Sequence, residues 1–528
     1  MHAAPEPEPA PAGSALSLAI EVFLRTAKRP VVLDPGEEAI VLSADNYLLT
    51  ARGAGLTLEC WSETRNLARR VRAIRAQRRG RLELEVERFG GRTGTLLLLD
   101  IEHPGNSAAE RRGARLQYRE RFRRSLLRQF SGWKLAELST EQDLHHSLSP
   151  SYPRALLRQG VTAWAAIGAG EEVSDPDGAL SFGLIWLDYL RRREPKLAVQ
   201  GLAIFLPEGA ERTTCHRIRH LDPGAGRYRV FVHDPTGHEQ SVEPGDYTNF
   251  ETRLEPFRGA PAVQPPELEN WVRRIAAIPG VELRERPGGA ISLLVRGLEF
   301  AHTLGDVLLF GLDGFQRADR HVAGGERQLQ EIEELARGLA RMRSAKAENR
   351  TNPLYTRRPE AWLESMVRAD PRTVDAGLYE SPVYAQAPEM AAGERGIVDL
   401  LGVDRDGRLA VIEIKASQDI HLPLQALDYW MRVRWHLERG EFAASGFFPG
   451  VPLSGAAPRL FLLAPALEFH PANEAVLRFL APGIPVERIG VGLQWRQELR
   501  IMFRSPVQHV RHEDLGPNPT RAGQFESG

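Results

Sequence analysis

The chain contains 528 residues, of which 42% are hydrophobic and 26% are charged, and its formal net charge is -1. These values predict a soluble globular protein of about two to four domains. Cys60 and Cys215 are its only cysteines, which excludes a disulfide framework or a zinc cluster and favours the cytoplasm, and no apolar run approaches the roughly 18 residues of a membrane span.

The N-terminal part gives few functional signals. Residues 1–14 lack the basic start and apolar stretch of a signal peptide, and we expect a disordered lead. Residues 15–255 predict an α+β region that we assign to no family. Within it we expect a buried helix at 182–193 and strands at 81–88, 95–101, 198–206 and 227–233.

Two arginine clusters break the overall charge balance. Eight arginines and no acidic residues lie between Arg65 and Arg81, and eight arginines with two glutamates lie between Glu110 and Arg128. Phosphate backbones attract such clusters. The second cluster also fits the solvent face of a helix, because apolar residues recur there at near-helical spacing: Leu116, Phe122, Leu126 and Phe130. DNA contact and a solvated face both remain open.

A proline-rich passage at 256–267 is expected to be a linker. Residues 268–345 predict a small α/β module with helices at 269–278 and 326–342 and strands near 291–295 and 307–312. Residues 346–510 carry the chemistry described next, and residues 511–528 are expected to be a tail.

Lysine is rare in this chain, with five lysines among 68 basic residues. One of them, Lys415, ends a predicted apolar strand at 410–415. Glu413 and Lys415 are two residues apart, so they point to the same face of that strand. The similar tripeptide Glu194-Pro195-Lys196 is set aside, because its proline cannot donate to a strand ladder and it joins a predicted helix to a predicted strand.

The segment before this strand predicts a β-hairpin, and its loop length decides which side chains meet. A two-residue loop at 406–407 would place Asp399 and Glu413 on opposite faces. A three-residue loop at 405–407, with Gly407 in the left-handed conformation, pairs residue 404 with 408 and therefore Asp399 with Glu413. We predict the three-residue loop, which puts Asp399, Glu413 and Lys415 on one face.

Two close, partly buried carboxylates repel each other unless a cation lies between them. Magnesium fits this need, since it binds one or two carboxylates and keeps positions for water and phosphate oxygens. Lys415 could then orient or deprotonate a bound water and neutralise charge that develops in the transition state. The pattern predicts metal-assisted hydrolysis of a phosphodiester.

The run from Gly396 to Lys415 resembles the catalytic hairpin of the PD-(D/E)XK nuclease superfamily, in which an aspartate precedes a hydrophobic strand ending in Glu-x-Lys. Gln425-Ala-Leu-Asp-Tyr429 resembles the Gln-x-x-x-Tyr helical motif of its RecB-like branch, and residues four apart share a helix face. Val398 departs from the proline in the superfamily's name. The resemblance covers about residues 355 to 505.

The resemblance implies roles for several residues. Asp399 and Glu413 would bind Mg²⁺, for which Mn²⁺ can substitute, and the Ile414 carbonyl would be a third ligand. Lys415 would be the catalytic base or an electrostatic stabiliser. Gln425 would orient the lysine or the scissile phosphate, with Tyr429 beside it.

A predicted helix at 359–367 precedes the hairpin, and in this superfamily such a helix often carries an additional acidic ligand. Glu364 is the candidate and Glu360 the alternative. Further core elements are expected after the hairpin, with strands at 458–464, 488–492 and 499–503 and a helix at 472–480.

The fold implied is α/β, with a C-terminal restriction-endonuclease-like mixed sheet flanked by helices and preceded by α+β domains. The function implied is a metal-dependent nuclease acting on nucleic acid, with DNA preferred over RNA, in repair, recombination or defence. The alternative is an inactive nuclease fold that binds nucleic acid or protein. The sequence contains no Gly-x-x-x-x-Gly-Lys-Ser/Thr motif, so any motor would be a separate chain.

Overall fold

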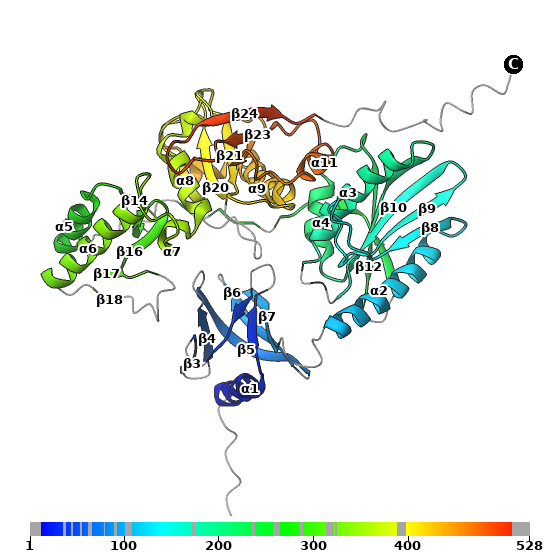
Figure 1. The fold of residues 1–528 in the computed structure, drawn as a ribbon, viewed down its shortest axis with the longest axis horizontal. Coiled ribbons are helices and arrows are strands. Elements are labelled where there is room, and N and C mark those ends of the chain that lie inside the picture. The colour runs from blue at the N-terminus through cyan, green and yellow to red at the C-terminus, as the bar shows by residue number, and fades with distance from the viewer. Residues whose placement is uncertain are drawn as a thin grey trace, which may run out of the picture. The chain divides into compact units, whose positions relative to one another are not determined.

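The computed structural model describes residues 12–508 except 35–38, 44–45, 53–54, 62–65, 79, 89–91, 101–107, 172, 174, 235–237, 251, 255, 257–264, 286–288, 313–320, 323–324 and 388–397. The described residues form four β-sheets with helices, so the chain is a mixed α/β protein (Figure 1). The predicted tail at 511–528, most of the predicted lead and most of the predicted linker lie outside them. The predicted domain limits stay predictions.

The chain divides into two compact units, Met1–Ala114 with Phe310–His321 and Arg115–Leu309 with Val322–Gly528. The first unit holds a seven-stranded antiparallel sheet in the order β2-β1-β7-β6-β5-β4-β3. Helix α1 (Ala12–Thr26) packs on β3, β4 and β5. The strands are β1 (Pro30–Leu33), β2 (Ile40–Val41), β3 (Tyr47–Arg52), β4 (Gly55–Trp61), β5 (Asn66–Arg78), β6 (Arg81–Arg88) and β7 (Arg92–Asp100).

The second unit contains a six-stranded sheet in the order β13-β12-β11-β10-β9-β8. Strands β10, β11 and β12 are parallel, and the outer strands β8, β9 and β13 run antiparallel to their neighbours. Helix α2 covers one face and helix α3 the other (Figure 1). The elements are α2 (Ala108–Gln129), β8 (Lys134–Ser139), β9 (Arg154–Gln159), β10 (Thr162–Gly168), α3 (Gly178–Arg193), β11 (Ala198–Pro207), α4 (Glu211–Ile218), β12 (Arg227–His233) and β13 (Glu239–Val242).

A five-stranded sheet follows in the order β14-β15-β16-β17-β18, and the helices α5 and α6 pack against it. The elements are α5 (Pro266–Ala276), β14 (Val281–Glu285), β15 (Ile291–Val295), β16 (Leu298–Leu304), β17 (Val307–Phe310), β18 (His321–Val322) and α6 (Glu326–Met342).

The last sheet has the order β19-β20-β21-β22-β23-β24, with β21, β22 and β23 parallel. One face packs on α8 and the other on α9, so the central strands β21 and β22 are buried on both sides, whereas residues of the edge strand β24 alternate between half-buried and exposed. The elements are α7 (Pro353–Thr356), α8 (Pro359–Ala369), β19 (Tyr384–Ala387), β20 (Val398–Val403), β21 (Leu409–Ile414), α9 (Leu422–Glu438), α10 (Glu441–Ala444), β22 (Arg459–Pro465), α11 (Asn473–Leu477), β23 (Val486–Val491) and β24 (Ile501–Pro506).

Most of the predicted elements are present with small shifts at their ends. The helix predicted at 472–480 is shorter, because α11 ends at Leu477 and Leu480 instead forms a β-bridge with Leu221. The predicted apolar stripe of α2 is wrong at Leu116, which is 48% exposed, while Tyr118 is buried in its place.

Both cysteines are buried and unbridged, Cys60 in β4 and Cys215 in α4. Burial, followed by a neighbouring glutamate charge, raises the pKa of each thiol to about 12. Among the helices that the structure describes, none is both long and apolar enough to span a membrane.

Candidate active site

The hairpin formed by β20 and β21 has the predicted register. Leu400 pairs with Ile412 and Val403 with Leu409, which extends to residue 404 opposite 408 and residue 399 opposite 413. The amide of Asp404 donates to the carbonyl of Arg408, which closes a three-residue loop. Gly407 has φ +74°, the left-handed conformation that this loop needs. The three-residue loop is therefore confirmed.

This register brings Asp399, Glu413 and Lys415 together on one face. Asp399 Oδ2 accepts a hydrogen bond of 2.8 Å from the amide of Ile414, which orients the carboxylate across the hairpin. Glu413 is 1% exposed, and its Oε1 lies 3.3 Å from Lys415 Nζ. The same ammonium lies 3.9 Å from Asp419. The site thus groups the buried Glu413 with the partly exposed Asp399 and Asp419, and Lys415 lies beside them.

The pKa values of this group reflect burial first and neighbouring charge second. Burial raises the pKa of Asp399 to about 6, against the hydrogen bond from Ile414. Burial and the Asp399 charge raise the pKa of Glu413 well above its usual range. Burial opposes the charged form of Lys415, but the charges of Glu413, Glu360, Asp399 and Asp419 together outweigh it and raise the pKa of the lysine. Lys415 is therefore an ammonium at neutral pH.

Helix α9 supplies the next layer of the site. Burial and then the charges of Glu413 and Asp399 raise the pKa of Tyr429, which places its hydroxyl near the acids. Gln425, one turn earlier, has a buried Oε1 without a hydrogen-bond partner among the described residues, and the same is true of Glu413 Oε2. Buried oxygens are normally hydrogen-bonded or bound to cations, so Glu413 Oε2 is a candidate ligand for a cation.

The acidic residues of α8 differ in their surroundings. Glu364 is buried, and its carboxylate lies 2.6 Å from Arg284 of β14. Burial raises its pKa to about 7 in spite of this arginine. Glu360 instead accepts a hydrogen bond of 3.4 Å from the amide of Ala416, next to the catalytic strand. Glu364 is therefore paired with Arg284, whereas Glu360 lies near Lys415.

The donor set fits a magnesium ion that keeps part of its own hydration shell. Within the described residues, no group of three or more His, Cys, Asp or Glu side chains is arranged to hold a metal. Asp399 and Glu413 supply two carboxylates, with Glu413 Oε2 unpartnered. Magnesium usually binds one or two carboxylates and completes its octahedron with water and phosphate oxygens, so two carboxylates are sufficient.

Two neighbours of this site were not predicted from the sequence. Arg284 lies 80 residues before its partner Glu364, and it comes from strand β14 whereas Glu364 belongs to helix α8. Asp419 follows Lys415 in the loop before α9, and only the fold shows that its carboxylate faces the ammonium. A separation of i and i+4 outside a helix predicts no contact, so local spacing could not find this pair.

The arginine cluster of β5 is balanced across the sheet by acidic residues that sequence order hides. Strand β6 pairs with β5 and presents its glutamates opposite the arginines. The ion pairs between the two strands include Arg72–Glu87 at 2.6 Å and Arg75–Glu85 at 3.0 Å. Arg69 of β5 also pairs with Asp34, just after β1, at 2.7 Å, and Arg81 pairs at 3.3 Å with Glu83 of its own strand β6. A phosphate would have to compete with these carboxylates, which favours the solvated-face interpretation for this cluster.

The cluster on α2 forms the predicted helix, with Phe122, Leu126 and Phe130 buried on its inner face. Its arginines also meet acids, since Arg121 lies 3.4 Å from Glu171 and Arg128 pairs with Glu239. DNA contact by this helix stays a prediction.

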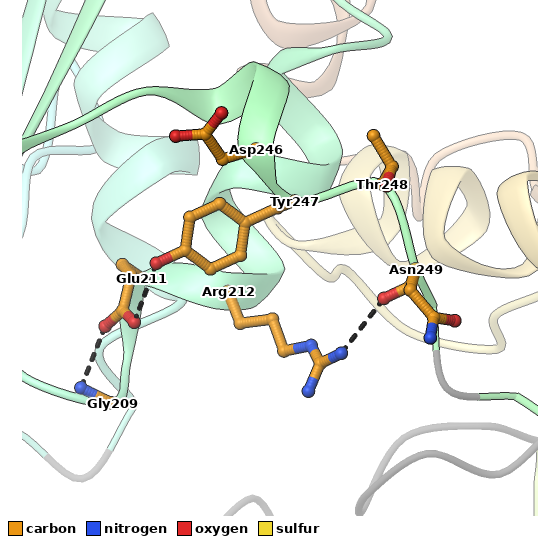
Figure 2. A pocket seen from close by; sticks show the side chains of 7 residues that line it. All are labelled: Gly209, Glu211, Arg212, Asp246, Tyr247, Thr248 and Asn249. Atoms are coloured by element: carbon orange, nitrogen blue, oxygen red, sulfur yellow. Dashed lines mark hydrogen bonds between the residues drawn. The ribbon is translucent and has the colours of Figure 1, made fainter.

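A surface pocket of about 380 Å³ lies at the start of α4 (Figure 2). The Arg212 guanidinium donates to the Asn249 carbonyl at 2.9 Å, and the Glu211 carboxylate accepts from the Gly209 amide at 2.8 Å and the Tyr247 hydroxyl at 3.1 Å. None of the predicted site residues lines this pocket, and its polar groups bind one another. It is not part of the candidate active site.

No protein-family model matches the chain. The chain is similar to Endonuclease NucS of Pyrococcus abyssi (strain GE5 / Orsay), with 34% identity over 71 residues, which are 13% of this chain and 26% of that protein. It thus spans about a quarter of the length of this curated relative. A crystal structure of a repair endonuclease from Pyrococcus abyssi aligns with 14% identity and a TM-score of 0.16, covering 37% of this chain and 73% of that chain. A TM-score this low carries no argument about the fold.

Proposed function

We propose that this chain is a Mg²⁺-dependent nuclease of the PD-(D/E)XK type, in its RecB-like branch, that hydrolyses phosphodiester bonds in DNA during repair, recombination or defence. The observation that carries the proposal is the buried carboxylate of Glu413, which lies 3.3 Å from Lys415 and has one oxygen without a partner in the part of the chain that the structure describes. The short similarity to an endonuclease supports the same chemistry.

Each residue of the site has a role that its surroundings allow. Asp399 and Glu413 would hold the metal, with the Ile414 carbonyl as a third ligand, and Glu360 or Glu364 would contribute through α8. Magnesium would supply a bound water of lowered pKa and polarise a phosphate oxygen. Lys415, kept charged by Glu413, would stabilise the negative charge that develops on the phosphate.

The residues of α9 would position the substrate. Gln425 has a buried side-chain oxygen without a partner among the described residues, and its amide would orient Lys415 or a phosphate oxygen. Tyr429 stays protonated because burial and the acids raise its pKa, so its hydroxyl would donate a hydrogen bond.

The test is a cleavage assay on single-stranded, double-stranded and forked DNA and on RNA, with Mg²⁺, Mn²⁺ or EDTA. We expect metal-dependent cutting by the wild type. Glu413→Ala and Lys415→Ala should each lower the rate by at least about 100-fold, because each removes a group that acts on the transition state. Binding of the substrate, measured by fluorescence anisotropy, should survive in both variants.

Lys196→Ala is the matched control, since Lys196 ends the chain's other Glu-x-Lys tripeptide and is exposed in the structure. Its rate should equal that of the wild type. Cutting that persists in EDTA, or that survives Glu413→Ala, would contradict the proposal.

A second function has one observation in its favour. Glu364, the predicted third acidic ligand, is bound to Arg284, so a complete acidic triad is not assembled in the described residues. A nuclease fold that binds nucleic acid or protein without cutting would show this arrangement. Binding without cutting in the wild type, with every metal and substrate above, would favour this function.

A further inference from the structure

The second unit contains the same sheet twice. In both six-stranded sheets, three antiparallel strands are followed by two parallel crossovers and one antiparallel edge strand. Strands β8 to β13 and strands β19 to β24 agree in order and in the direction of every neighbouring pair. Unrelated sheets rarely agree in both the order and the directions of six strands.

The helices repeat in the same places. A helix precedes the first strand of each sheet, α2 in one and α8 in the other, and packs on one face. The first crossover helix, α3 or α9, covers the opposite face, and a short helix, α4 or α11, forms the second crossover. Residues 108–242, the first copy, therefore repeat the plan of residues 359–506, the second copy.

The register of the repeat shows what the first copy has at the active-site positions. The amide of Lys415 donates to the carbonyl of Leu463 at 2.9 Å, and the amide of Ala169 donates to the carbonyl of Phe205 at 2.9 Å, each just beyond a parallel ladder. Ala169 thus corresponds to Lys415, and Ile167 corresponds to Glu413.

Across the hairpin, Ile167 pairs with Arg154 where Glu413 faces Asp399. Ile167 and Ala169 are packed in the apolar core. The Arg154 guanidinium donates to the Glu141 carbonyl at 2.9 Å and lies 5.5 Å from the ring of Trp186. The first copy therefore lacks both carboxylates and the ammonium.

The two copies pack through contacts that come in reciprocal pairs. Leu221, after α4, forms a β-bridge with Leu480, after α11. The Asp222 amide donates to the Phe479 carbonyl at 2.8 Å, and the Ala481 amide donates to the His220 carbonyl at 2.9 Å.

Helix contacts repeat this reciprocity, because α4 of the first copy packs on α9 of the second and α11 of the second packs on α3 of the first. Arg217 pairs with Asp428 at 2.8 Å, and Arg478 lies 3.9 Å from Asp188. Contacts in which each side repeats the other are the mark of a two-fold interface.

We propose that the first copy is a non-hydrolytic partner domain that fills the position a second subunit would take, so that the chain is a monomer with one hydrolytic centre and cuts one DNA strand at a time. The claim that the chain cuts one DNA strand rests on the proposed function. The claim that the first copy takes the place of a second subunit rests on the fold alone. A dimer that joins two active copies has two centres for two antiparallel strands, whereas this chain has one.

The first measurement is independent of activity. Light scattering with size-exclusion chromatography should give a monomer, near 58.9 kDa, at micromolar concentrations. A stable dimer without DNA would overturn the proposal, because the two-fold surface would then not be satisfied within one chain.

The second measurement uses a supercoiled circular DNA with enzyme in excess and Mg²⁺. Early in the reaction, the amount of nicked circle should exceed the amount of linear DNA by at least about tenfold. Linear product that forms without a preceding nicked circle would overturn the proposal. If the protein cuts no substrate at all, the proposed nuclease function is wrong. The measured molar mass then still tests whether the first copy takes the place of a second subunit.

A matched pair of variants separates the two copies. Glu413→Gln should abolish nicking, and Ile167→Val, at the corresponding position of the first copy, should leave it within about twofold of the wild type. Loss of nicking in Ile167→Val with an unchanged melting temperature would show that the first copy takes part in hydrolysis and would overturn its assignment as a partner domain.

Discussion

The carboxylates of Asp399 and Glu413 are costly to keep charged where they lie. Glu413 is 1% exposed, and one of its oxygens has no hydrogen-bond partner among the described residues. Burying a charge without full compensation lowers stability, and such arrangements concentrate at functional sites. The metal-free site should therefore be a source of instability that a cation relieves.

Asp399→Asn should stabilise the metal-free protein at neutral pH. The folded pKa of Asp399 is about 6, above its usual value of 3.8, so the folded state binds more protons than the unfolded state between these values. The free energy of unfolding of the wild type then falls as pH rises from about 4 to 6. Asparagine does not titrate, so the variant does not lose this stability. In EDTA, thermal melts should show the variant equal to the wild type near pH 4 and more stable by about 1–3 kcal/mol at pH 7.5.

Added Mn²⁺ provides the control for this comparison. It should raise the melting temperature of the wild type and leave that of Asp399→Asn nearly unchanged, since ligand binding to the folded state stabilises it. A variant that is less stable than the wild type across the whole pH range would contradict the explanation.

The hairpin of β20 and β21 places Asp399 opposite Glu413, and Gly407 allows the three-residue loop that this register needs. A Cβ on this glycine would lie 2.1 Å from the carbonyl oxygen of Pro452, and its φ is +74°. Gly407→Ala should therefore lower the free energy of unfolding by at least about 2 kcal/mol and weaken cleavage, because both strain and a backbone clash oppose the native loop. Urea denaturation and the cleavage assay measure the two effects.

Gly440→Ala is a suitable comparison, because Gly440 has φ +67° with no atom near the added Cβ. It isolates the conformational cost, which should be about 1 kcal/mol. Equal losses in the two variants would show that the contact with Pro452 does not hold the loop.

The sequence predicted the register of the β20–β21 hairpin correctly, for a local reason. Asp406-Gly407 between two β-rich runs limits the loop to two registers, and only one brings Asp399 to Glu413. The pairing of Glu364 with Arg284 could not be predicted, because helix α8 and strand β14 are far apart in the sequence and meet only in the fold. The glutamates of β6 opposite the β5 arginines depended on strand pairing in the same way.

Over the whole second unit, one apolar core joins the sheet of β8–β13 to the sheet that bears the candidate active site. Arg217 and Asp428 form a buried, two-point ion pair within this contact, with hydrogen bonds of 2.9 and 2.8 Å. The two sheets should consequently unfold together. The repetition of the sheets was not visible in the sequence, since strand order and direction become known only when the strands are paired.

Arg217→Met should lower stability by about 3–5 kcal/mol, because it leaves the Asp428 carboxylate buried without its partner. Calorimetry should show a single shifted transition for the second unit, because the shared core transmits the loss to both sheets. The double variant Arg217→Met with Asp428→Leu should recover most of the loss. Two separate transitions in the single variant, with only the first sheet affected, would contradict this coupling.

The burial of both cysteines has a practical consequence. With thiol pKa values of about 12, Cys60 and Cys215 hold almost no thiolate at neutral pH and are shielded from reagents. Maleimide dyes should therefore leave the native chain unlabelled and react only at engineered surface cysteines. Fluorophores placed one on each copy could then report by energy transfer whether the two sheets separate when substrate arrives.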